Sequence, residues 1–239
     1  MRDVLESLER WRERGDEIAV ATVIDTWGSA PRPVGSKMVS TSAGSIAGSV
    51  SAGCVEGAVI QEGERVVRTG APRLLTFGVA DDTAWEDGLA CGGEIAVFVE
   101  PFSALAGVYE RMKAPLAAGE PMAVVSVLEG PDEMLHHKLI VLEDGQTEGD
   151  LALDGRTGQV VAEALSLLAR EAGGVVELEE GLRLFIETYP AAPRLIIVGA
   201  VHIAEPLIAI AKTVGFDTIL VDPRSAFATR ERFPDVDEL

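Results

Sequence analysis

The strongest constraint on the fold lies towards the C-terminal end of the sequence. After the prolines of 190–193 the chain reads RLIIVGAVHIAEPLIAIAKTVGFDTILVDPR. In this stretch an all-apolar strand meets a glycine turn, then a helix from about His202 to Thr213, and then a second apolar strand that ends at Asp222. Continuous apolar runs are typical of parallel sheets that are covered on both faces. The pattern therefore predicts a Rossmann-like βαβ unit over 194–239.

The glycine turn of this unit matches a dinucleotide-binding fingerprint only in part. The fingerprint uses three glycines, for the turn, for phosphate approach and for helix packing, and an acidic residue about twenty positions further on. In this sequence only the first of the three glycines is present, as Gly199, and Val201 and Ala204 occupy the second and third glycine positions. Asp222 is the acidic residue. His202, in the first turn of the helix, either faces a ligand or is solvated. The pattern favours a Rossmann fold and argues against NAD(P) as its ligand.

Two strands are too few for a stable doubly wound sheet with both faces covered. The unit over 194–239 therefore reads as truncated, and we expect it to complete its sheet against another chain. Self-association follows as a prediction, with a homodimer as its simplest form.

The first 189 residues have a different pattern of apolar and polar residues. Short alternating or continuous apolar stretches predict strands, and apolar residues at helical spacing predict helices. Residues 17–24, for example, read as a buried strand and 103–118 as a helix, and the proline-flanked break at 190–193 marks a domain boundary. The predicted class is α/β, with an α+β domain over 1–189 followed by the truncated Rossmann-like unit over 194–239.

Charge and composition exclude several classes of partner. The chain carries 39 acidic against 20 basic residues, a net charge of -19, which argues against nucleic acid or an anionic membrane surface. No apolar run approaches the length of a membrane span, and the N-terminal residues do not resemble a signal peptide. The two cysteines, 37 positions apart, read as free thiols. These features predict a soluble, cytoplasmic protein.

The first cysteine, Cys54, lies where the small-residue stretch GSIAGSVSAG runs into a helix expected to end near Gly70. The positive end of a helix macrodipole favours a thiolate. Ser49, Ser51 and Gly53 can also cradle an anion at such a helix start. The segment therefore predicts an accessible thiol beside an anion-binding loop.

The second cysteine, Cys91, lies in ACGGE, where Gly92 and Gly93 permit unusual backbone geometry and close ligand approach. Free cysteine is also among the most buried residue types and is often an inert small hydrophobe. Both interpretations stay open for the pair. A zinc site is disfavoured, because the chain has no C-x-x-C motif and His136 and His137 are adjacent.

Two charged loops carry weaker signals. Arg32 and Lys37 bracket a loop rich in proline and glycine, where they either meet a phosphate or are solvated cations on a rigid turn. The acidic loop 81–88 either lines an entrance or is a wet surface.

Four segments together resemble the XdhC/CoxI family of accessory proteins for molybdenum hydroxylases of the xanthine dehydrogenase type. They are TVIDTWGSAPRPVGSKMV, GSIAGSVSAGCVEGAV, CGGEIAVFVEP and LIIVGAVHIAEPLIAIAKTVGFDTILVDPRSAFATRERFP. The resemblance implies a chaperone, not an enzyme with its own turnover. Such a chaperone binds the molybdenum cofactor as cargo, protects it while its terminal sulfido ligand is installed, and delivers it to the apo-hydroxylase. A cysteine desulfurase is a further implied partner.

The resemblance also implies site residues. Cys54 and Cys91 match the family cysteines of GCVE and CGG, and are expected to handle sulfur and to contact molybdenum as soft thiolates. The positions expected to contact the cofactor are Lys37, Ser51, Gly53, Cys54, Glu56, Cys91, Gly92, Gly93, Gly199, His202 and Asp222.

This sequence departs from the family pattern at three places in the Rossmann part. Val201 replaces the second glycine, Pro223 replaces an aspartate, and Pro206 interrupts the helix one turn in. Two other functions stay open: an NAD(P)-dependent oxidoreductase, and an interaction scaffold with two inert buried cysteines.

Overall fold

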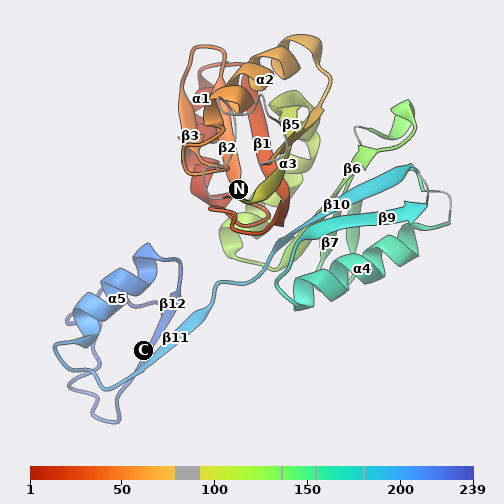
Figure 1. Ribbon diagram of the computed structural model, residues 1–239. Helices are drawn as coiled ribbons and strands as arrows, with labels where there is room; N and C mark the ends of the chain where they lie inside the picture. The colour runs from red at the N-terminus through yellow and green to blue at the C-terminus, as the bar shows by residue number, and fades with distance from the viewer. Residues whose placement is uncertain (79–91, 136, 154, 180) are drawn as a thin grey trace. The chain divides into compact units, whose positions relative to one another are not determined.

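A computed structural model of the chain describes residues 1–78, 92–135, 137–153, 155–179 and 181–239. It divides into two compact units, Met1–Pro190 and Ala191–Leu239, and each is described by itself (Figure 1). The predicted mixed α/β class is confirmed.

The first unit begins with an antiparallel five-stranded sheet in the order β3-β2-β1-β5-β4. Its strands are β1 (Ile18–Trp27), β2 (Lys37–Thr41), β3 (Ile46–Gly48), β4 (Arg73–Phe77) and β5 (Glu94–Pro101). Helix α2 (Glu56–Thr69) covers one face of this sheet, because its buried Val59 and Val66 pack with Ala21, Val23 and Val97 of the strands.

A second antiparallel sheet of the same unit has the order β8-β7-β6-β10-β9. Its elements are β6 (Met122–Glu129), η2 (Asp132–Met134), β7 (Lys138–Leu142), β8 (Thr147–Asp150), α4 (Thr157–Ala169), β9 (Gly174–Glu179) and β10 (Leu182–Tyr189). Alternate residues such as Val125, Leu139 and Ile186 pack under α4. The short, fully exposed β8 has no apolar signal, so the sequence did not indicate it.

The remaining faces of the two sheets share a core. Ile24 and Phe98 of the first sheet pack with Leu128 and Phe185 of the second. A larger cluster joins both sheets to η1 (Arg2–Val4), α1 (Leu5–Glu13) and α3 (Phe102–Ala118), with Tyr109 fully buried. The first unit is therefore a sandwich of two sheets with α2 and α4 on its outer faces.

The second unit contains two parallel strands, β11 (Arg194–Val198) and β12 (Asp217–Val221), joined by α5 (Ala204–Thr213). Its core forms where Ile197 and Leu220 meet Ala204 and Ile208 of the helix. The helix begins at Ala204, so His202 lies in the turn before it.

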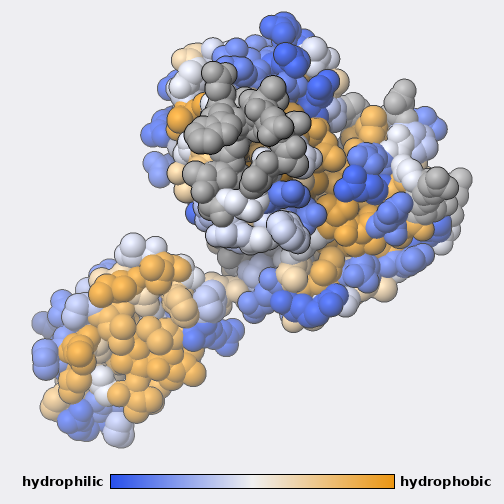
Figure 2. Space-filling view, viewed as in Figure 1, coloured by the Kyte–Doolittle hydropathy of each residue, from blue (hydrophilic) through white to orange (hydrophobic). Residues whose placement is uncertain are grey.

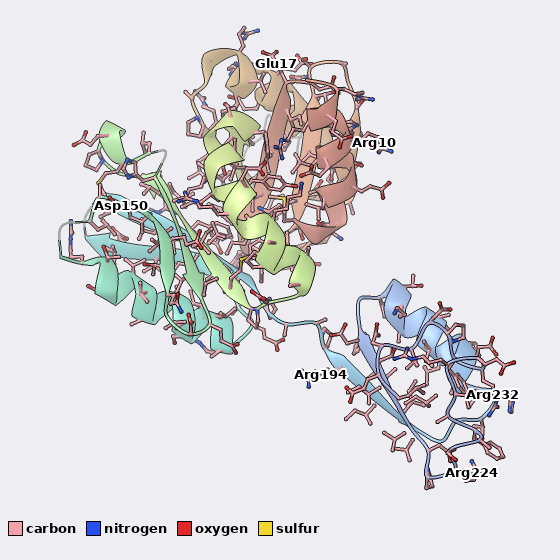
Figure 3. The ribbon with its side chains drawn as sticks, turned by 180° about the vertical axis from the view of Figure 1, so that it is seen from behind. Arg10, Glu17, Asp150, Arg194, Arg224 and Arg232 are labelled. Atoms are coloured by element: carbon pink, nitrogen blue, oxygen red, sulfur yellow. The ribbon has the colours of Figure 1, made fainter. Side chains whose placement is uncertain are left out.

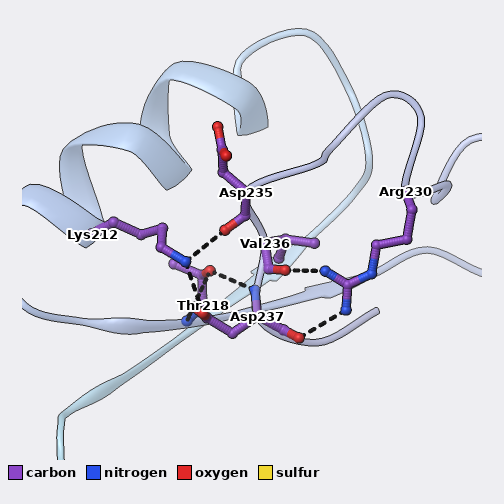
Figure 4. A network of polar contacts seen from close by, with 6 residues as sticks. All are labelled: Lys212, Thr218, Arg230, Asp235, Val236 and Asp237. Carbon is purple, nitrogen blue, oxygen red and sulfur yellow. Dashed lines mark hydrogen bonds and ion pairs between the residues drawn. The ribbon is translucent and has the colours of Figure 1, made fainter. Parts of the chain in front are cut away.

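The segment after β12 is fixed to this small sheet by polar contacts (Figure 4). The Asp237 carboxylate accepts hydrogen bonds of 2.8 Å from the Thr218 N–H, from the Thr218 hydroxyl and from Lys212 Nζ. The bond from Lys212, followed by those from Thr218, lowers the pKa of Asp237 to about 2. Phe233 and Val236 of this segment enter the core.

One face of the second unit exposes apolar side chains, visible as a broad hydrophobic surface in Figure 2. The exposed large apolar residues of the unit are Ile196, Val198, Val201, Ile203, Leu207, Ile210, Val214, Val221, Phe227 and Leu239. Four of them, within α5 or at the residues that flank it, recur at 203, 207, 210 and 214, the spacing of one helical stripe. Within the described residues, no helix combines the length and the apolarity that crossing a membrane would need.

Candidate functional site

The loops that carry Cys54 and Gly92–Gly93 adjoin strand ends at the same end of the first sheet. The strand register puts the end of β1 beside the start of β5, because Trp27 pairs with Glu94. It also puts the start of β2 beside the end of β3, because Met38 pairs with Gly48. The Cys54 loop follows β3 and Gly92–Gly93 precede β5, so the topology brings both segments to this end.

Cys54 is exposed and lies two residues before the first residue of α2. The loop that presents it turns sharply, since Ala52 has φ 59° and Gly53 has φ 113°. A left-handed alanine is uncommon and persists only where surrounding contacts hold it. The Ala52 N–H donates a 2.8 Å hydrogen bond to Ser49 Oγ, which is one of these contacts.

The carboxylate of Glu56, in the first turn of α2, lies at the centre of this loop. Glu56 Oε1 accepts hydrogen bonds from Ser49 Oγ (2.6 Å), the Val50 N–H (3.2 Å) and the Ser51 N–H (2.9 Å). Glu56 Oε2 accepts from the Gly53 N–H (2.8 Å) and from the Ser51 hydroxyl. The loop is thus wrapped around a carboxylate of its own chain.

Ser51 extends these contacts to the cysteine itself. Its side chain is buried, and its Oγ accepts hydrogen bonds from the Cys54 N–H (3.0 Å) and the Val55 N–H (2.9 Å). The donors of Ser51 and Gly53, expected from the sequence to cradle an external anion, are therefore used inside the loop. A carboxylate suits this position, because the start of a helix stabilises negative charge.

The pKa of Glu56 reflects the same contacts. Burial alone would raise it, but the hydrogen bonds from Ser49 and Ser51 outweigh that effect and lower it to about 2. Glu56 is therefore ionised throughout the neutral range.

Cys91 lies outside the described residues, whereas Gly92 and Gly93 lie within them. Gly93 is held so close to the β1 end that a Cβ there would lie 2.5 Å from the Ser29 carbonyl oxygen and 2.9 Å from that of Trp27. This second glycine of the CGG motif therefore has a packing role. The acidic loop 81–88 also lies outside the described residues.

Lys37 was expected to lie near a phosphate or in solvent, but its side chain is buried in the first unit. Its side chain is 4% exposed, and Nζ lies 2.8 Å from Thr22 Oγ1 and 2.9 Å from Glu187 Oε2. An ammonium between two sheets needs such partners, because burying an unpaired charge is costly. Its main chain still touches the Cys54 loop, since its carbonyl accepts a 2.9 Å bond from the Ser49 N–H.

A second buried ion pair lies in the same layer, and sequence reasoning missed it. Lys138 Nζ lies 2.9 Å from Glu100 Oε2 and donates to Ser126 Oγ at 2.9 Å. The available signal was a charged residue at an otherwise apolar, inward position of a strand, as in KLIVL.

Arg32 borders an open groove of about 330 Å³ that Pro33, Gly35 and Tyr189 also line. One guanidinium nitrogen lies 3.4 Å from Asp3 Oδ2, and Nε has no hydrogen-bond partner among the described residues. The groove has room for a small anionic group, but acidic Asp3 and Glu187 also line it.

The predicted residues of the Rossmann-like part lie in the second unit. Gly199 has φ 112°, His202 is exposed, and Asp222 is held at the end of β12. The Asp222 carboxylate accepts from the Ala200 N–H (2.8 Å) and from Arg224, labelled in Figure 3, at 2.8 and 2.9 Å. Hydrogen bonds from Arg224, then from the Ala200 N–H, hold the pKa of Asp222 well below its usual range. Both carboxylate oxygens are thus engaged within the chain.

In the part of the chain that the structure describes, no group of three or more His, Cys, Asp and Glu side chains has the arrangement of a metal site. His137 is described and His136 is not. The expected contact of Cys54 and Cys91 with molybdenum remains a prediction.

Comparisons with known proteins give family matches in both parts of the chain. Residues 11–78 match the model described as the XdhC and CoxI family, and residues 195–238 match the XdhC Rossmann domain. Over 239 residues the chain is 29% identical to a Bacillus subtilis (strain 168) protein named as a probable xanthine dehydrogenase subunit, covering 97% of this chain and 67% of the relative. Over 84 residues it is 34% identical to molybdenum cofactor insertion chaperone PaoD of Escherichia coli (strain K12), covering 35% of this chain and 26% of the relative.

A solved structure is similar along nearly the whole chain. The crystal structure of a xanthine dehydrogenase from Bacillus halodurans matches with a TM-score of 0.71 and 28% identity, covering 98% of this chain and 66% of that one. The chain therefore spans about two thirds of the length of that protein and of the Bacillus subtilis relative.

Proposed function

The chain belongs to the XdhC and CoxI family, and on that premise we propose that it is a chaperone for the molybdenum cofactor. In this proposal it binds the cofactor as cargo, protects it while its terminal sulfido ligand is installed, and passes it to an apo molybdenum hydroxylase. The relative named as a molybdenum cofactor insertion chaperone supports a role in maturation.

The observation that carries the proposal is the exposed thiol of Cys54 on a loop with a defined internal structure. A soft thiolate is a better partner for molybdenum or a persulfide than a carboxylate would be. The thiol lies two residues before the first residue of α2, on the loop that leads into this helix. We assign Cys54, together with Cys91, to contact with the cofactor.

In this proposal the two parts of the chain have different roles in cofactor binding. The domain over 1–189 supplies the thiols, and the Rossmann-like part over 194–239 supports binding through Gly199 and His202. An NAD(P)-dependent oxidoreductase is the weaker alternative, because Arg224 and Ala200 engage the carboxylate of Asp222 that would hold a ribose.

The partners follow from the same proposal. The client is an apo-hydroxylase of the xanthine dehydrogenase type, a cysteine desulfurase supplies sulfur, and the protein acts in the cytoplasm. The apolar face of the second unit favours self-association, because apolar patches of this kind commonly mark interfaces.

Client activation tests the proposal. An apo-hydroxylase would receive limiting molybdenum cofactor and a desulfurase, anaerobically, with the wild-type chain, with Cys54→Ser or with Ser42→Ala as an exposed control. We expect wild type and Ser42→Ala to raise the yield of active hydroxylase, and Cys54→Ser to lose most of the gain. No stimulation by wild type would contradict delivery, and full stimulation by Cys54→Ser would contradict the thiol role.

A further inference from the structure

We infer that Glu56 is a positioning residue for Cys54, a resident anion of the loop, and not a ligand of the cofactor. The inference rests on the proposed function only in taking Cys54 as the contacting group. It replaces the expectation, implied by the family resemblance, that Glu56 and Ser51 touch the cofactor directly.

The peptide groups around the cysteine are hydrogen-bonded to Glu56 or to Ser51. The Gly53 N–H, one residue before the cysteine, donates to Glu56 Oε2 at 2.8 Å. The N–H groups of Cys54 and Val55, which lie before and after the Cys54 side chain, both donate to Ser51 Oγ, at 3.0 and 2.9 Å. The Ser51 hydroxyl in turn donates to Glu56 Oε2. One carboxylate therefore fixes the backbone on both sides of the thiol, directly or through a single hydroxyl.

The acceptor sites of the Glu56 carboxylate are filled by donors of its own loop. An ionised carboxylate offers about four lone-pair sites. Glu56 already accepts from five donors, which are the Ser49 and Ser51 hydroxyls and the N–H groups of Val50, Ser51 and Gly53. Its oxygens have no acceptor capacity left for a ligand.

The negative charge of Glu56 occupies the place before α2 where an external anion would bind. A helix start with free N–H groups is an anion site. Here the donors before α2 already bind the negative charge of Glu56, so an incoming anion meets a carboxylate beside Cys54 instead of free donors. The loop therefore presents its thiol without an anion cradle, and the phosphate end of a cofactor must be held elsewhere.

Thiol chemistry tests this without any cofactor. In a Cys91→Ser background, which leaves Cys54 as the only thiol, the rates of modification by neutral iodoacetamide and by the anionic reagent 5,5′-dithiobis(2-nitrobenzoate) would be compared. Glu56→Gln removes the resident charge, so we expect the anionic-to-neutral rate ratio to rise several-fold. Glu64→Gln is the matched control, because it removes an exposed carboxylate of the same helix and should leave the ratio unchanged.

Two further variants separate charge from general loosening of the loop. Ser51→Ala keeps the carboxylate but removes the acceptor of the Cys54 N–H, so amide exchange at 54 and 55 should accelerate while the reagent ratio stays near wild type. Glu56→Asp keeps the charge and should also hold the ratio. If Glu56→Gln leaves both the ratio and the exchange at 50–55 unchanged, the inference is wrong.

Titration with isolated molybdenum cofactor distinguishes this result from failure of the proposed function. A wild-type chain that does not bind cofactor, with a reagent ratio that still responds to Glu56→Gln, would remove the chaperone proposal and keep the positioning role. Wild type that binds, with Glu56→Gln binding equally well and labelling like wild type, would keep the chaperone proposal and remove the positioning role.

Discussion

At the scale of single residues, the structure shows how the fold tolerates charge between two sheets. Lys37 and Glu187 meet at 2.9 Å with side chains 4% and 11% exposed, and Thr22 satisfies a further proton of the ammonium. The sequence alone suggested a surface cation at Lys37, because the loop before it is rich in proline and glycine. Glu187 is brought between the two sheets by the pairing of β10 with β6. Lys37 and Glu187 are 150 positions apart in the sequence, so their contact could not be read from local patterns.

Breaking this pair should cost much stability. Lys37→Met removes the cation that pairs with the buried Glu187 carboxylate, so the free energy of unfolding should fall by about 3–5 kcal/mol. Urea unfolding would measure it, with Lys113→Met as a control that removes a partly exposed pair to Glu9. The double change Lys37→Met, Glu187→Leu should recover much of the loss, and a loss as large as in the single variant would contradict this interpretation.

At the scale of elements, the segment from Ser49 to Gly70 was partly predictable. The helix after Cys54 and its end at Gly70 follow from the sequence, and both are confirmed, since the Gly70 N–H closes the last turn on the Val66 carbonyl at 2.8 Å. The function of Glu56 inside its own loop was not predictable. It depends on Ala52 and Gly53 adopting left-handed backbone angles, which no spacing rule encodes.

The Glu56 loop should make stability depend on acid. The pKa of Glu56 falls from 4.5 to about 2 on folding, so its contribution is complete above about pH 4.5 and is lost as pH falls through that window towards 2. Melting temperatures between pH 6 and pH 2.5 should therefore fall more steeply for wild type than for Glu56→Gln. Equal slopes for the two proteins would show that the loop contacts do not contribute to stability.

The glycine pair after Cys91 allows another test at this scale. Gly93→Ala places a Cβ 2.5 Å from the Ser29 carbonyl oxygen, which is too close for any real contact, so the end of β1 or of β5 must shift. We expect faster amide exchange at 27–29 and weaker cofactor binding. Gly107→Ala is the control, because in α3 the added methyl group would have no atom within 4 Å other than those of its chain neighbours and of its own helix backbone. Unchanged exchange in Gly93→Ala would contradict the packing role.

At the scale of the whole molecule, the βαβ pattern and the family resemblance were readable because each rests on local runs of residues. The organisation of the first unit as two facing five-stranded sheets could not be read from the sequence, because it depends on pairings between distant strands. One example is the pairing of β1 with β5, about 75 positions apart. The bare apolar face of the second unit was anticipated by the argument that two strands cannot cover both faces of a sheet.

Self-association through that face can be measured directly. Val198 is 80% exposed, so Val198→Asp should shift sedimentation towards monomer without unfolding the chain, whereas the exposed control Ser225→Asp should not. A wild-type chain that sediments as a monomer at every concentration would contradict this use of the face.

Contact between Cys54 and the molybdenum cofactor is tested most directly by anaerobic titration of isolated cofactor into wild type and Cys54→Ser. We predict stoichiometric binding by wild type and binding weaker by roughly tenfold or more in Cys54→Ser, as loss of even an outer partner of a metal site costs that much. Equal affinity in the two proteins, or no binding by wild type, would contradict the claim.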